Sequence, residues 1–137
     1  MSRILVVDDE SEMILILKKY LRKNGFTVFG ANSGLKALEI LEKNKNIDLM
    51  ILDMKMPGIR GIDVLEKLKN KQMVLPVIVL TGSLNFSGFI DRMEKLGYSP
   101  EDVLFKPVAL QELLNKICSK IEDLKKTADE TRENGSD

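Results

Sequence analysis

The chain of 137 residues contains no histidine and only one cysteine, Cys118. Without histidine, the sequence excludes Ser-His-Asp and Cys-His catalysis and most kinds of zinc site. A single cysteine cannot form an internal disulfide, which suits a reducing compartment. Any chemistry that uses a histidine must therefore take it from another molecule.

The sequence also lacks an excess of either charge and has no long apolar run. Lys+Arg and Asp+Glu both number 21, so the net charge is zero and neither nucleic acid nor an anionic membrane is indicated as a partner. No run is long enough to cross a bilayer, and the first residues lead directly into a predicted strand rather than a signal peptide. We therefore expect a cytoplasmic protein with a single domain.

What the sequence does contain is a set of short apolar runs, at residues 4–7, 49–52, 77–80 and 103–105. Runs this short, separated by segments with helical periodicity, are typical of buried strands in a parallel sheet. A further strand at residues 27–30 gives five strands that alternate with five helices. Right-handed crossovers place helices on both sheet faces, so the pattern predicts an α/β, flavodoxin-like (βα)5 fold: a doubly wound parallel five-stranded sheet in the order 2-1-3-4-5.

The predicted helices cover about residues 11–24, 34–43, 62–71, 89–96 and 109–126. In the first we expect Ile16 in the core stripe, with Ile14 and Leu15 outside it, and in the second we expect Leu35 to be buried with Leu38. The domain is predicted to span residues 1–126. The remainder, residues 127–137, has almost no apolar side chain and is predicted to be a disordered polar tail.

Polar residues stand where four of the predicted strands end. Asp8 and Asp9 follow the first strand, Asp53 the third, Thr81 the fourth and Lys106 the fifth. Ligands of open α/β sheets bind beyond the carboxyl ends of the strands, which form one edge. Each residue alone is more often a cap, a turn residue or a solvated side chain. Together, at these positions, they indicate a functional site.

Carboxylates that converge in this way suit a hard cation. Two of them about 4 Å apart repel by roughly 4 kcal/mol at an effective dielectric near 20, and Mg²⁺ accepts carboxylate oxygens while keeping places for phosphate oxygens. A carboxylate can also act as a nucleophile that forms an acyl phosphate. The charge on the transferring group would be met by the metal, by Lys106 and by the hydroxyl of Thr81, and Gly82 would leave room for the donor.

Four motifs in order resemble the receiver domain of bacterial two-component response regulators, across residues 3–121. They are Ile4-Leu5-Val6-Val7-Asp8-Asp9-Glu10, Leu52-Asp53-Met54-Lys55-Met56-Pro57-Gly58 with Gly61, Leu80-Thr81-Gly82, and Phe105-Lys106-Pro107. The resemblance implies that the phosphoacceptor is Asp53. The implied Mg²⁺ ligands are Asp8, Asp9, Asp53 and the backbone carbonyl of Lys55, and the implied phosphoryl contacts are Thr81 and Lys106. It also implies a cis peptide bond between Lys106 and Pro107.

By the same resemblance the chain is a module of a phosphorelay and not a turnover enzyme. Its phosphoryl group would come from a phosphohistidine of a sensor histidine kinase or a histidine phosphotransfer domain, for which Ile14 and Leu15 form a candidate docking patch. Its other expected partners are a downstream protein target or an output domain, and a second copy that contacts Ile121 and Leu124 of the last helix. Direct contact with nucleic acid or membrane is not expected.

Two departures from the family pattern leave other functions open. The family usually has Tyr or Phe where this chain has Val103, and the segment from Thr81 to Lys106 is longer than usual around residues 98–101. Both departures favour a pseudo-receiver that docks proteins without being phosphorylated. A phosphatase similar to haloacid-dehalogenase enzymes is disfavoured, because Asp53-Met54-Lys55 lacks the second acid of the Asp-x-Asp pattern and the chain has no cap domain.

Overall fold

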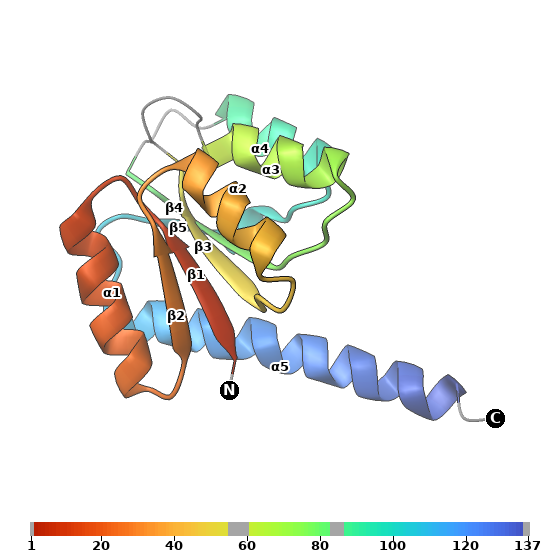
Figure 1. Cartoon of the computed structure of the whole chain (residues 1–137). Coiled ribbons are helices and arrows are strands. Elements are labelled where there is room, and N and C mark those ends of the chain that lie inside the picture. The colour runs from red at the N-terminus through yellow and green to blue at the C-terminus, as the bar shows by residue number, and fades with distance from the viewer. Residues whose placement is uncertain (1, 55–60, 83–86, 136–137) are drawn as a thin grey trace.

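The sheet of the protein is parallel and has five strands, as the computed structural model describes it over residues 2–54, 61–82 and 87–135. The strands are β1 (Arg3–Val7), β2 (Thr27–Ala31), β3 (Leu49–Asp53), β4 (Val77–Thr81) and β5 (Val103–Phe105). They lie in the order β2-β1-β3-β4-β5 (Figure 1). The predicted fold class and strand order are confirmed.

Helices cover both faces of this sheet. They are α1 (Ser11–Lys23), α2 (Gly34–Lys43), α3 (Gly61–Asn70), α4 (Ser87–Lys95) and α5 (Leu110–Gly135), with a short 3₁₀ helix, η1 (Pro100–Asp102), before β5. Figure 1 shows α2, α3 and α4 on one face and α1 and α5 on the other. Strands covered on both faces must be apolar on both, which explains why the strands read as continuous apolar runs instead of alternating ones.

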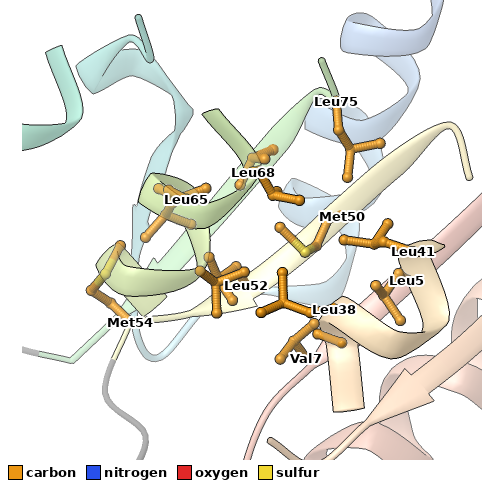
Figure 2. Close-up of a cluster of buried hydrophobic side chains, with 14 of the residues drawn as sticks. Leu5, Val7, Leu38, Leu41, Met50, Leu52, Met54, Leu65, Leu68 and Leu75 are labelled. Carbon is orange, nitrogen blue, oxygen red and sulfur yellow. The ribbon is translucent and has the colours of Figure 1, made fainter. Parts of the chain in front are cut away.

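The core is divided into two clusters by the sheet. The larger one packs the sheet against α2, α3 and α4, and Figure 2 shows part of it: Leu5, Val7, Met50 and Leu52 from the strands, with Leu38, Leu41, Leu65 and Leu68 from the helices. The smaller one packs the other face against α1 and α5 and includes Ile4, Val6, Ile51, Ile78, Leu17, Leu21, Leu113 and Ile117. Both clusters fix the strands whose ends carry the candidate site.

Two helical side chains lie differently from the prediction. Leu35 is 61% exposed, because with 3.6 residues per turn it lies about a third of a turn away from the buried line of α2. Ile16 is 49% exposed, whereas Ile14 is partly buried and packs against the smaller cluster. The reason lies on β2: a Cβ at Gly30 would come within 2.7 Å of the Ile14 side chain, so the missing side chain leaves a hollow that Ile14 fills.

The last helix is longer than predicted. Its backbone remains helical through Gly135 instead of ending near residue 126, so most of the segment predicted to be disordered is helical. No glycine or proline interrupts residues 110–134, and Ala, Glu, Lys and Arg favour helix even without packing. Its 26 residues span about 39 Å, and the end projects past the sheet (Figure 1). Across the described residues, every helix is too short or too polar to cross a bilayer.

The exposure of Leu35 can be tested against a truly buried leucine. Leu68 is fully buried in the larger cluster, so Leu68→Ala should lower the free energy of unfolding by about 2–5 kcal/mol. Leu35→Ala removes the same atoms from an exposed position and should change it by less than about 0.5 kcal/mol. Urea unfolding measures both, and a similar loss in the two variants would contradict this description of α2.

Candidate functional site

The register of the parallel strands brings the candidate residues to one edge. Asp53 is the last residue of β3, and Asp8 directly follows β1. Because β1 and β3 are paired neighbours, these two carboxylates leave the sheet side by side. On the other side of β3, Thr81 ends β4, and the backbone N–H of Lys106 donates to the carbonyl oxygen of Thr81 at 2.8 Å. The sheet therefore assembles residues that are far apart in the sequence.

Three carboxylates meet at this edge. Asp8, Asp9 and Asp53 each offer an oxygen, and these oxygens lie within 4.8 Å of one another. Asp8 is 1% exposed and Asp53 is 3% exposed, whereas Asp9 is open to solvent. Two of the charges are thus shielded from water, and the third lies where a solvated ion can reach the group.

Hydrogen bonds and one cation hold the buried acids in place. Oδ1 of Asp8 accepts the backbone N–H of Glu10 at 2.9 Å. Oδ2 of Asp8 lies 3.4 Å from Nζ of Lys106, which is also 3.5 Å from Oδ1 of Asp53. The lysine therefore contacts both buried carboxylates, at distances longer than those of a short charge-assisted hydrogen bond.

The ammonium group of Lys106 keeps its charge in this setting. Burial is the largest single influence and acts to lower its pKa, but the attraction of Asp53 and Asp8 together outweighs it, so the pKa is raised above the usual value. The charge stabilises the folded protein below the ordinary lysine pKa, and this contribution is lost only as the pH rises through the higher folded value. At neutral pH the site therefore always contains a cation.

Glycines shape the approach to the site. A Cβ at Gly61 would come within 2.9 Å of the Asp53 carbonyl oxygen, so α3 can begin this close to the acid only with glycine there. A Cβ at Gly82 would meet no atom of the described residues within 4 Å, so their packing does not require glycine at this position. The steric role of Gly61 was not predicted, because nothing in the sequence tells how near α3 lies to β3.

The peptide bond between Lys106 and Pro107 is cis, as the resemblance implies. Lys55, the expected source of a carbonyl ligand, lies outside the described residues. Val103 is buried at 8% exposure and belongs to the larger cluster, against which Tyr98 is also packed. Phe105, by contrast, is 45% exposed.

The donors at this edge fit a hard divalent cation. The acids offer only oxygen ligands, which Mg²⁺ prefers. With the carboxylates ionised, three negative charges gather beside Lys106. A divalent cation would reduce the repulsion between them more than a monovalent ion.

Comparisons with known proteins agree with this geometry. A family model described as "Response regulator receiver domain" matches residues 4–118. The chain is 32% identical to regulatory protein VanR of Enterococcus faecium over 125 residues, which are 91% of this chain and 52% of that protein. The chain thus spans about half the length of this relative.

Solved structures show the same similarity. A response regulator receiver domain protein from Clostridium thermocellum is 35% identical, with a TM-score of 0.80 over 91% of this chain and 98% of that one. Response regulator protein TrrA from Thermotoga maritima, solved in complex with Mg(2+)-BeF, is 31% identical, with a TM-score of 0.74 over 88% of this chain and 99% of that one.

Mg²⁺ should stabilise the folded protein through the three carboxylates. A ligand that binds only the folded state at one hundred times its Kd adds about 2.7 kcal/mol, which raises the Tm by several degrees. Asp9→Asn should remove most of this rise, whereas Asp91→Asn, an equally exposed change on α4, should leave it unchanged. Thermal unfolding with Mg²⁺ and with EDTA measures the rise, and an equal rise in the Asp9 variant would refute the assignment of the cation to this cluster.

Proposed function

The chain belongs to the family of response regulator receiver domains of two-component systems, and from that membership we propose that Asp53 is the residue that accepts a phosphoryl group. The observation that carries the proposal is the position of this carboxylate. It is buried next to a second buried acid, and a lysine ammonium lies 3.5 Å from its oxygen. A carboxylate in this position can act as a nucleophile toward a phosphoryl group that reaches the edge of the sheet.

In the proposed reaction, an oxygen of Asp53 attacks the phosphorus of a phosphohistidine. A new O–P bond forms as the P–N bond breaks, and the imidazole leaves with its electron pair and takes a proton from solvent. Lys106 stabilises the charge on the phosphoryl oxygens, and the Thr81 hydroxyl donates to one of them. Thr81 ends β4, the neighbour of β3, and Lys106 follows β5, so the sheet brings both residues to the edge that carries Asp53.

A bound Mg²⁺ would supply further charge neutralisation between the carboxylates and the phosphoryl oxygens. We propose that Asp8, Asp9 and Asp53 hold it, with the carbonyl of Lys55 as a further ligand. The similarity to TrrA supports this, since that protein was solved in complex with Mg(2+)-BeF. The three carboxylates of this chain offer oxygens close enough together for one ion.

A phosphohistidine that donates the phosphoryl group must lie outside this chain, because the chain has no histidine. Response regulators take signals from sensor kinases and pass them to downstream targets. We propose that the donor, a sensor histidine kinase or a histidine phosphotransfer domain, docks on α1. The apolar patch there consists of Leu15 and Ile16, which are 53% and 49% exposed, and not of Ile14.

Self-association through α5 is the weakest of the proposed contacts. Ile121, one of the two expected dimer residues, is partly buried and packs against the smaller cluster of its own chain. Part of this side chain is therefore already in contact with its own chain. A dimer could contact only the part that is exposed to solvent.

Labelling by a small phosphodonor tests the assignment of Asp53. With acetyl phosphate and Mg²⁺, the intact protein should gain one phosphoryl group by mass spectrometry, and Asp53→Asn should gain none. Asp91→Asn makes the same chemical change at an exposed position on α4 and should label like the parent. A parent protein that neither responds to Mg²⁺ nor labels would support the pseudo-receiver instead.

The role of Lys106 can be tested by removing its charge. With acetyl phosphate and Mg²⁺ at neutral pH, Lys106→Gln should label about 10²–10³-fold more slowly than the parent, as expected when one charge-stabilising group is removed. Initial rates of labelling measure the loss, and a variant that labels as fast as the parent would contradict this role of Lys106.

A further inference from the structure

A cavity of about 640 Å³ opens at the edge of the sheet opposite to the three carboxylates. It is lined by the loop that leads into β4, by the end of α3, by the segment that follows α4 and by one residue of α5. Val77, the first residue of β4, lines the cavity, whereas Thr81, the last residue of β4, belongs to the phosphoacceptor site. Four steps along a strand span about 13 Å, so the two sites are separate.

Most of the cavity wall is apolar. Met73, Leu75 and Leu96 line it together with the ring of Tyr98. Val74, at its rim, is 98% exposed. Burial raises the pKa of the Tyr98 hydroxyl, and no hydrogen bond joins this group to another of the described residues. Cavities of this size and composition are typical of sites for small organic molecules.

The charges around the cavity leave one lysine uncompensated. Nζ of Lys120 and Oδ1 of Asp102 lie 2.5 Å apart, with side chains only 20% and 15% exposed, so these two charges cancel each other. Lys69 donates to the backbone carbonyl of Lys95 at 3.2 Å. Among the side chains that the structure describes, those of residues 2–54, 61–82 and 90–122, no acid lies within ion-pair distance of Lys69. The cavity therefore has a net positive charge at one side of an apolar wall.

Part of the wall comes from the segment between α4 and β5, to which Tyr98 and Asp102 belong. The segment is ordered by η1, whose cap Ser99 accepts the backbone N–H of Glu101 at 3.2 Å, and the ion pair of Asp102 with Lys120 connects it to α5. This segment therefore forms one side of the cavity.

We propose that this cavity binds a small organic anion with an apolar, preferably aromatic, body and a single anionic group. The apolar body packs between Leu75, Leu96 and Tyr98, and the anionic group pairs with Lys69. This binding is a function distinct from phosphoryl acceptance, and it does not depend on Asp53. A purely apolar ligand would leave the lysine charge unmatched, and a dianion would exceed the one free positive charge.

The test uses 4-phenylbutyrate as the probe and 4-phenylbutanamide as its neutral counterpart of the same shape. Each is titrated into the whole chain and followed by ¹H–¹⁵N NMR. The acid should give saturable shifts confined to residues 69–77 and 96–102, and the amide should bind about tenfold more weakly, as expected for loss of one charge-assisted hydrogen bond. The same affinity in Asp53→Asn shows that the result is independent of the phosphoacceptor.

Two exposed lysines on α3 provide matched variants. Lys69→Gln should weaken binding of the acid about tenfold and leave that of the amide unchanged. Lys67→Gln removes the same charge but lines a different groove, between α2 and α3, and should have no effect. The proposal is overturned by any of three results: no saturation by about 10 mM acid, a concentration ten times a Kd of 1 mM; equal binding of acid and amide; or equal losses in the two lysine variants.

Discussion

Repulsion between carboxylates that are held side by side out of water is the constraint on which this structure depends. Asp8 and Asp53 are both nearly fully buried, and a third acid lies within reach of them. At about 4 Å and an effective dielectric near 20, each such pair costs roughly 4 kcal/mol, a large part of the 5–15 kcal/mol by which domains are typically stable. Lys106 offsets part of this cost because it contacts both buried acids. The repulsion that remains favours binding of a cation, or a reaction that changes the charge at Asp53.

The remainder of the fold keeps these charges from moving apart. Exposed acids would relax into water, but the strands that carry Asp8 and Asp53 are fixed by hydrogen bonds to each other and by apolar clusters on both faces. The helix that starts at Gly61 closes on the Asp53 backbone so tightly that a methyl group would not fit. Packing energy gained throughout the core thus maintains an unfavourable arrangement at one edge, which is how a fold prepares a site for a reaction.

The positions of the strands and of the residues at their ends can be predicted from the sequence. The contacts between different elements cannot. β1 and β3 could be located because a short apolar run between two helical segments predicts a buried strand. Neighbouring parallel strands then bring the aspartates at their ends, Asp8 and Asp53, together. Ile16 was misplaced because the exchange with Ile14 depends on a missing side chain at Gly30, on another element. The end of α5 was misplaced for the opposite reason. A segment without apolar residues cannot be buried, but good helix formers can extend a helix that packing has already nucleated.

The cavity could not be predicted from the sequence, because segments that are far apart in the chain form it. Its position relative to β4 bears on how it can affect the phosphoacceptor. The two sites share β4, which begins at the cavity and ends at Thr81. In the family pattern, a ring three residues before the lysine can change its rotamer, but Val103 is β-branched, stiff at χ1 and packed beside Val79. The backbone of β4, which both sites share, offers a route by which one site can influence the other. Such an influence is reciprocal, so phosphorylation would change the affinity for the anion by the same factor as the anion changes the phosphorylation equilibrium.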